Sequence, residues 1–309
     1  MRARRIIAVS LAAGSLLLGA ACAGNDVAGG SKDKGSVSIS GQNFPEATLV
    51  AEIYKQVLEK NGYTVNVKLV GTRDVYMKQF PKSVDIVPEY VAGIADFLNT
   101  QQNGSNAAPV STNDPAGTLS AVKPLTDAAG ITMLDTSEAT DQNAFMVKKD
   151  FADTNSLKTL SDLGKLGKPV VLAAAPDCKG RSDCEGGLSK TYGIKITKIL
   201  PLGYASAQTY DSVKKGESQL GETSTTDGSL AAQGLVLLTD DQGVQPAQNL
   251  VPAVSTAFLD KHADVKPVLN DLMAKLTTAD LTELNGKVGN EREKPADVAK
   301  QWLTDQGLL

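Results

Sequence analysis

The sequence predicts an α/β protein of two domains with parallel-rich sheets. Segments in which apolar and polar residues alternate are followed by segments with helical periodicity, and this order repeats along the chain. Strand–helix–strand repeats favour parallel strands with helices on both faces. The chain has 309 residues, enough for two domains that each have a hydrophobic core. Its 41% hydrophobic and 21% charged residues are typical of globular proteins.

The N-terminal residues 1–21 have the pattern of a secretory signal peptide and are excluded from the fold. Three arginines precede an uncharged apolar run at 6–21, which is short for a membrane span and ends in small residues. Cys22 follows directly and resembles the acylated cysteine of bacterial lipoproteins. Gly19 stands where such sites usually have leucine, so secretion without lipidation is the alternative. The polar, Gly-rich stretch 22–35 predicts a flexible tether.

The first half of the chain contains alternating segments that predict strands. They lie at 36–40, 64–70, 84–87 and 131–134. The helix between the first two is the clearest, because Val50, Ile53 and Val57 fall on one face and Gly62 follows as a stop. Further helices are expected at 74–80, from Glu89 onward and at 119–129. The polar stretch 101–117 predicts a surface loop.

The same alternation continues after residue 140, and the chain then ends in helices. Strands are expected at 143–149, 169–175, 196–202, 218–226, 234–241 and 249–255. Helices are expected at 159–167, 187–192 and 205–215, at 265–276, and from 278 and 295 onward. Thr159 is a capping residue at the start of its helix, and Pro295 stands in a first turn, where proline is favoured.

The chain has few of the residues on which enzymes and nucleic-acid-binding proteins depend. Its net charge is −4, from 31 basic and 35 acidic residues that are spread along the sequence, so there is no basic stripe for a phosphate backbone. It has no phosphate loop, no GxGxxG motif after a strand and no GxSxG elbow. The single histidine, His262, is expected to be solvated. We therefore expect no catalysis, cofactor, metal or nucleic acid.

Two cysteines lie beyond the N-terminal segment, Cys178 and Cys184. Export would place them in an oxidising compartment, where an even pair favours a disulfide. Closing so short a loop contributes roughly 2 kcal/mol of stability in the chain-entropy description. Two unrelated buried thiols are the alternative.

Several short motifs occur in a distinctive order along residues 36–309. They are GQNFPE (41–46), VDIVPEY (84–90), DQNAFMV (141–147), TLSDL (159–163), APDCKGRSD (175–183), STTDG (224–228) and LLTDD (237–241). Each motif is short, but the ordered set resembles the osmoprotectant-binding proteins of ABC importers. That family captures glycine betaine, choline and related solutes.

The resemblance implies a type II periplasmic-binding-protein fold, in which two α/β lobes are joined by two chain crossings and the ligand lies in the cleft between them. Lobe 1 would comprise 36–140 plus 229–309, and lobe 2 would comprise 141–228. The resemblance also implies a function in transport. The protein would capture a small solute and deliver it to a permease driven by a separate ATPase. We expect a monomer on the outer face of the cell membrane, held by a lipid anchor at Cys22.

The ligand site implied by the resemblance combines an aromatic cage with an arginine. A quaternary ammonium has no N–H group and is held by aromatic faces, whereas a carboxylate is held by an arginine or by backbone N–H groups. Arg181 falls on the family's carboxylate-binding arginine, Tyr90 on one cage tyrosine, and Gln42 on a polar position near the ligand. As alternatives, Arg181 pairs with Asp177 or Asp183, Tyr90 packs in the core, and Gln42 stabilises a turn.

Other positions depart from the family's pattern. Asn143, Ser224 and Gln248 stand where tyrosines are often found, and Gly93 stands where threonine is common. We include Thr225 in the predicted site, with helix capping as the alternative. Asn143 is also compatible with a turn. A lining of amides and hydroxyls suits a different polar or hydroxylated solute, which is the alternative ligand.

Two other classes of protein remain as alternatives. One is a secreted enzyme on a two-lobe scaffold, which the absence of catalytic motifs disfavours. The other is a surface lipoprotein that binds another protein, which would have an exposed apolar patch and no enclosed cleft.

Overall fold

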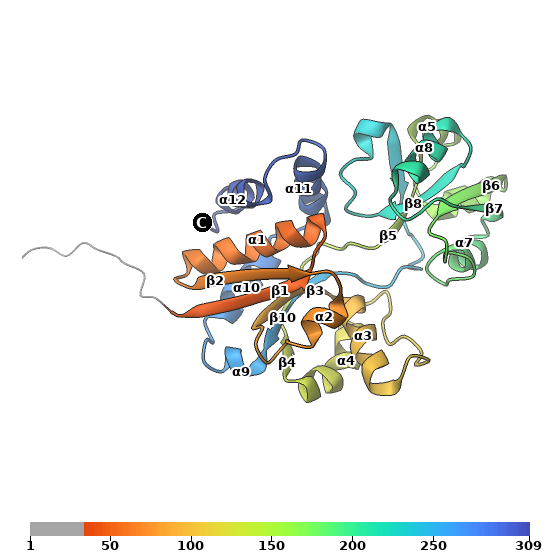
Figure 1. Ribbon diagram of the computed structural model, residues 1–309. Coiled ribbons are helices and arrows are strands. Elements are labelled where there is room, and N and C mark those ends of the chain that lie inside the picture. Colours follow the sequence, from red (N-terminus) through yellow and green to blue (C-terminus); the bar gives the residue numbers. More distant parts are fainter. Residues whose placement is uncertain (1–33) are drawn as a thin grey trace, which may run out of the picture. The chain divides into compact units, whose positions relative to one another are not determined.

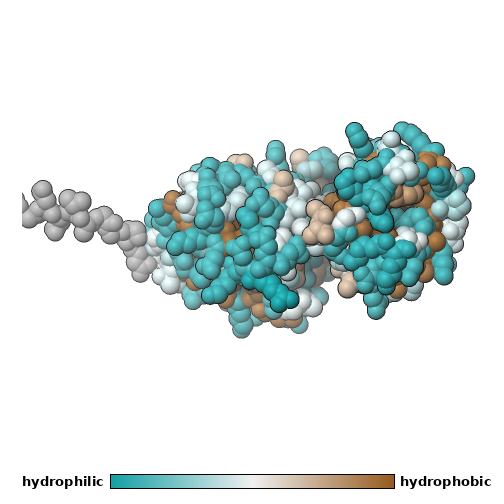
Figure 2. Space-filling model, turned by 90° about the horizontal axis from the view of Figure 1, so that it is seen from above, coloured by the Kyte–Doolittle hydropathy of each residue, from teal (hydrophilic) through white to brown (hydrophobic). Residues whose placement is uncertain are grey.

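The computed structural model describes residues 34–309, which form two five-stranded mixed sheets with helices (Figure 1). The predicted signal peptide, Cys22 and nearly all of the tether lie outside the described residues. None of the helices at 34–309 has the length and apolar content needed to cross a membrane. The face seen in Figure 2 is mostly hydrophilic, and hydrophobic residues show on it only in small, separate areas.

The first sheet, with the order β2–β1–β3–β10–β4, is parallel on one side and antiparallel on the other. β1 pairs in parallel with β2 and β3, whereas β10 runs antiparallel to β3 and β4. The strands are β1 (Ser36–Gln42), β2 (Thr64–Val70), β3 (Ile86–Tyr90), β4 (Ile131–Met133) and β10 (Leu250–Ser255). The chain therefore leaves this sheet after β4 and returns to it with β10.

Helices cover both faces of the first sheet. Successive strand residues point to opposite faces, and both faces carry apolar residues that the helices bury. In β3, Ile86 packs in one core and Val87 in the other. The core with Ile86 is covered by α1 (Pro45–Lys60), α9 (Thr256–Leu259), α10 (Val265–Met273), α11 (Thr278–Gly289) and α12 (Pro295–Asp305). The core with Val87 is covered by α2 (Arg73–Met77), α3 (Val91–Asn103) and α4 (Pro115–Ala129), as Figure 1 shows.

The second sheet has the order β7–β6–β8–β5–β9 and also has a core on each face. In β5, Phe145 and Met146 point into different cores. The strands are β5 (Asn143–Lys148), β6 (Pro169–Ala174), β7 (Lys195–Pro201), β8 (Leu220–Ser224) and β9 (Leu235–Leu238). The helices are α5 (Lys149–Asn155), α6 (Leu160–Leu166), α7 (Glu185–Tyr192), α8 (Ala207–Lys215) and the short 3₁₀ helix η1 (Ala231–Gln233).

The position of β9 contradicts the predicted boundary between the lobes. It lies in the range 229–309 that we assigned to lobe 1, but it pairs with β5 in the second sheet. Leu235 and Leu238 are buried in the two cores of that sheet, which is why the strand remains there. The return to the first sheet therefore comes between β9 and β10 and not near Asp227.

α5 was not predicted, because Ala152 is its only buried residue and the segment has no apolar periodicity. The helix follows β5 directly and ends at Ser156, which has a positive φ of 55°. Short polar helices of this kind carry little hydrophobic signal in the sequence.

The two segments that connect the sheets run beside each other. Thr140 and Asn249 form an isolated antiparallel bridge, and the backbone N–H of Asp141 donates to the carbonyl of Gln248 at 3.1 Å. Thr225, just after β8, donates from its hydroxyl to the carbonyl of Thr140 at 2.6 Å. The connection is therefore a hydrogen-bonded pair of strands. Segments of this type are where domain hinge motions are commonly absorbed.

α6 and α7 approach closely at Gly164. A methyl group added there would lie 1.9 Å from the carbonyl oxygen of Tyr192. We therefore expect Gly164→Ala to lower the free energy of unfolding by about 1–3 kcal/mol, because the helices must separate. The matched control is Gly289→Ala, since nothing lies within 4 Å of the added methyl at Gly289. Thermal unfolding measures both, and equal melting temperatures for the two variants would contradict the prediction.

Candidate ligand-binding site

A cavity of about 610 Å³ is lined by elements of both sheets. Its walls are the start of α1, the end of α11, the connection before β5, the loop between β7 and α8, and the segment after β8. A hollow of about 470 Å³ beside α4 and β4 is smaller and is lined by elements of the first sheet alone. Position and size make the larger cavity the candidate site.

Glu46 forms part of the cavity wall at the start of α1. Pro45 occupies the first helical turn, where proline is favoured, and the acidic side chain at the next position suits the positive end of the helix dipole. Only 5% of Glu46 is exposed. Its carboxylate accepts hydrogen bonds from the Tyr90 hydroxyl and, at 2.6 Å, from the Asn285 amide. Residues from β3 and α11 thus fix this carboxylate in place.

Asp141 provides a second carboxylate, from the connection that precedes β5. Its Oδ1 accepts from the Thr226 hydroxyl at 3.0 Å. Burial, followed by the negative charge of Glu46, raises the pKa of Asp141 to about 7, against the opposing effect of hydrogen bonds from Thr226 and Ser224. The negative charge of Glu46 therefore disfavours the ionised form of Asp141 in this cavity.

Three tyrosines belong to the site. Tyr204 and Tyr210 line the cavity, and Tyr90 reaches it through Glu46. Tyr204 is 44% exposed, so its ring is accessible to a bound molecule. The hydroxyl of Tyr210 donates to Asp227 at 2.6 Å. The cavity therefore combines carboxylates with aromatic rings.

Asp227 also lines the cavity, but its oxygens are occupied by its neighbours. They accept from the hydroxyls of Thr223 at 2.5 Å and Ser229 at 2.6 Å, in addition to Tyr210. The lining residues, all of them described by the structure, include these three carboxylates and no lysine or arginine. The cavity is therefore acidic.

The structure brings two of the predicted site residues to this cavity. Ser224 lines it, and Tyr90 binds its Glu46. Gln42 ends β1, where its backbone pairs with Val70, and it is not among the lining residues.

Thr225 and Gln248 are engaged with the backbone instead. The Thr225 hydroxyl accepts from the N–H of Gln142 at 3.0 Å in addition to its bond to Thr140. Gln248 accepts from the backbone N–H of Gly93 at 3.1 Å, in the first turn of α3. Neither residue lines the cavity. Their hydrogen bonds hold the connection and the start of a helix.

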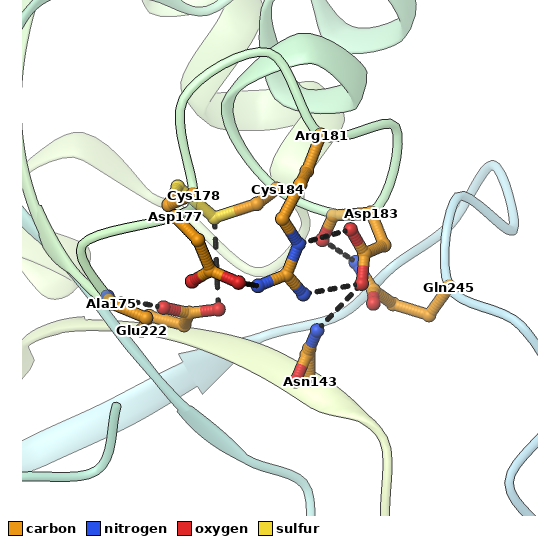
Figure 3. A network of polar contacts seen from close by, with 9 residues as sticks. All are labelled: Asn143, Ala175, Asp177, Cys178, Arg181, Asp183, Cys184, Glu222 and Gln245. Carbon is orange, nitrogen blue, oxygen red and sulfur yellow. Dashed lines mark hydrogen bonds and ion pairs between the residues drawn. A yellow bond between two sulfur atoms is a disulfide. The ribbon is translucent and has the colours of Figure 1, made fainter. Parts of the chain in front are cut away.

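Arg181 is held in a polar network with two aspartates (Figure 3). Its Nε and Nη2 donate to the two oxygens of Asp183 at 2.9 and 2.6 Å, and Nη1 donates to Asp177 at 3.2 Å. The Asn143 amide donates to Asp183 as well, at 3.0 Å. Arg181 and Asn143 therefore lie together but are not among the residues that line the cavity.

A disulfide between Cys178 and Cys184 closes the loop that carries Arg181, with an S–S distance of 2.02 Å. Both cysteines are fully buried. The bridge is drawn beside Arg181 in Figure 3. The part of the chain that the structure describes contains no group of three His, Cys, Asp or Glu side chains that could hold a metal ion.

Most of the lining residues were not among the predicted site residues, including Glu46, Asp141, Tyr204, Tyr210 and Asn285. Glu46 and Asp141 stand within the motifs GQNFPE and DQNAFMV, so a signal was present. The expected cage was aromatic, so the carboxylates of these motifs were not among the predicted site residues. Tyr204 and Tyr210 lie beside or within a predicted helix, and no local pattern distinguishes them from packing residues.

The sequence matches a protein family over residues 35–305, namely the substrate-binding domain of the ABC-type glycine betaine transport system. The chain belongs to this family. It is 27% identical to the glycine-betaine-binding protein of Pseudomonas aeruginosa, over 94% of this chain and 93% of that protein. It is 28% identical to the glycine betaine-binding protein YehZ of Escherichia coli, over 88% of this chain and 90% of YehZ.

A solved structure confirms the predicted fold. The crystal structure of a glycine betaine/carnitine/choline ABC transporter component covers 88% of this chain and 98% of its own, with a TM-score of 0.76 at 21% identity. The family consists of substrate-binding proteins of transporters, so the chain is not an enzyme. Its partners are a small molecule and a permease, and such binding proteins work outside the cytoplasm.

The raised pKa of Asp141 predicts a pH-dependent stability. Between about 3.9, the pKa of an unfolded aspartate, and about 7, the folded chain holds a proton that the unfolded chain releases. The free energy of unfolding should therefore fall as pH rises through this window, by at most about 1.4 kcal/mol per pH unit from this group, and level off above it. Asp141→Asn should lack this contribution.

Urea unfolding at a series of pH values from 4 to 8 measures this effect. The control is Asp150→Asn, because the Asp150 side chain is 82% exposed. We expect the control to follow the wild-type curve, and Asp141→Asn to gain stability relative to both as pH rises. Parallel curves for wild type and Asp141→Asn would contradict the raised pKa of Asp141 in the folded chain.

Proposed function

We propose that this chain captures osmoprotectants of the glycine betaine and choline type and delivers them to the permease of an ABC importer. The observation that carries the proposal is the acidic, tyrosine-lined cavity in a member of the glycine betaine transport family. A trimethylammonium group is attracted to aromatic faces and to carboxylates, and it needs no hydrogen-bond acceptor. The cavity supplies both kinds of group, from Tyr204, Glu46 and Asp141.

The predicted residues outside the cavity have a separate place in this proposal. Arg181 and Asn143 lie in one network, and Arg181 is our predicted partner for a ligand carboxylate. Movement of the two sheets about the paired connections would be needed to bring this network to a ligand. Gln42 remains a predicted polar contact at the end of β1.

The N-terminal sequence supports an anchored protein. We infer that residues 1–21 are removed as a signal peptide, that Cys22 is lipidated, and that 22–35 tether the binding domain to the outer face of the membrane. In this arrangement the protein acts as a monomer, with the permease and its ATPase as partners.

A different polar solute is the second candidate for the ligand. The lining offers the amides of Asn285 and Asn290 and the hydroxyls of Ser224 and Thr226. Such groups favour a compound that donates and accepts hydrogen bonds.

Isothermal titration of residues 34–309 tests the proposal. Glycine betaine, choline, carnitine and a panel of polar metabolites would be titrated in turn. Micromolar binding of a quaternary ammonium compound supports the osmoprotectant function. Binding of another metabolite, without any quaternary ammonium compound, would support the second candidate.

Tyr204 supplies the aromatic face in this proposal. We expect Tyr204→Ala to weaken binding of the quaternary ammonium ligand about 5- to 30-fold, the range expected when a desolvated cation–π contact is lost. Tyr204→Phe keeps the ring and should retain most of the affinity. If both variants bind as the wild type does, the ring does not contact the ligand.

A further inference from the structure

The cavity contains negative charge that no side chain of opposite sign neutralises. Glu46 receives its hydrogen bonds from Tyr90 and Asn285, and Asp141 receives its hydrogen bonds from Thr226 and Ser224. All of these donors are neutral. A hydrogen bond from a neutral group lowers the cost of a buried carboxylate but leaves its charge in place, whereas a cation also removes the repulsion between two carboxylates.

The backbone offers little to an anion on the same wall. α1 begins at the cavity, and helix N-termini commonly bind anions through free N–H groups. Here the first helical residue is Pro45, which has no N–H, and Glu46 places a carboxylate beside this end of the helix. A ligand carboxylate at the start of α1 would therefore be repelled by Glu46. It would also find one backbone N–H fewer than at a helix that begins without proline.

The predicted anion-binding residue is already neutralised. Arg181 is paired with Asp183 and Asp177, at 2.6 and 3.2 Å. Glu222, which is fully buried, lies in the same network and accepts from the N–H of Ala175 at 2.7 Å (Figure 3). One positive charge thus faces three carboxylates, so the network as a whole is negative and would repel a further carboxylate.

We propose that this cavity selects solutes with a net positive charge and no carboxylate over the corresponding zwitterions. The inference rests on the proposed function, because it concerns the ligand of the same cavity. The cationic group would lie between the carboxylates of Glu46 and Asp141, with the ring of Tyr204 on its accessible side. Choline fits this description, whereas glycine betaine adds a carboxylate for which the cavity has no cationic partner.

Choline and glycine betaine form a matched pair, because they share the trimethylammonium group and differ in a hydroxymethyl group against a carboxylate. Isothermal titration at pH 8, above the pKa of Asp141 of about 7, compares them on the same protein. We expect choline to bind at least tenfold more tightly. Glycine betaine binding as tightly as choline, or more tightly, would overturn the inference while leaving the osmoprotectant function intact.

Three variants locate the origin of the preference. Glu46→Gln removes one charge and should bring the two affinities to within about threefold of each other, by weakening choline and strengthening glycine betaine. Arg181→Ala tests the opposing case, in which Arg181 leaves Asp183 and holds the ligand carboxylate. Asp150→Asn, at an exposed site, is the control for a change in total charge. A selective loss of glycine betaine binding in Arg181→Ala would also overturn the inference. Thermal unfolding of each variant identifies any loss of folding.

The experiment also distinguishes an error in the proposed osmoprotectant function from an error in the charge preference. If neither compound of this pair binds, the same titrations with ethanolamine and serine, and with agmatine and arginine, compare other amines with the amino acids that carry one more carboxylate. Tighter binding of the amine would support the charge preference and reject the osmoprotectant function. Tighter binding of an amino acid, or no binding by any cation, would reject the preference itself.

Discussion

The buried carboxylate of Glu46 is the contact on which the site depends. It receives a hydrogen bond from Tyr90 at the end of β3 and another from Asn285 in α11, so it joins three elements that are far apart in the sequence. Asn285 also donates to the carbonyl of Thr226, which follows a strand of the second sheet. The Asn285 side chain thus links the carboxylate of Glu46, beside the first sheet, to the backbone of Thr226, which follows a strand of the second sheet. The position of Asp141 relative to Glu46, and with it the charge of the cavity, follows from these links.

Most residues that line the cavity lie outside the cores, although Tyr210 also packs against the buried cluster around Met146. Four buried clusters lie on the faces of the two sheets, and the cavity is lined by chain segments at strand and helix ends. This is where ligands bind in many α/β proteins, because the ends of strands and the loops that follow them can change without disturbing the packing between sheet and helices. The residues that line the cavity can therefore vary while the packing of the fold is kept.

The sequence predicted the features that depend on local patterns. Helix α1 was found from its apolar face, most strands from alternation, and the paired cysteines from composition and export. The positions of side chains at the candidate site depend on long-range contacts, which local patterns in the sequence do not specify. Arg181 and Asn143 were chosen by alignment with the family, but their side chains meet Asp183 rather than the cavity. Asp141 has no unusual local sequence; its pKa is raised by burial and by a residue nearly one hundred positions away. β9 was placed with the wrong sheet because four apolar residues carry no information on which edge they pair with.

The pairing of the two connections has a consequence for how the chain is divided between the sheets. The second sheet and its helices form one continuous excursion of the chain, which starts after β4 and ends before β10. The ends of this excursion touch at Thr140 and Asn249, so a tight turn could replace it and leave the first sheet's strand order intact. In terms of connectivity, the second sheet is an insertion between β4 and β10, which are neighbours in the first sheet. The cavity takes residues from both halves, so a chain without this insertion would have only one wall of it.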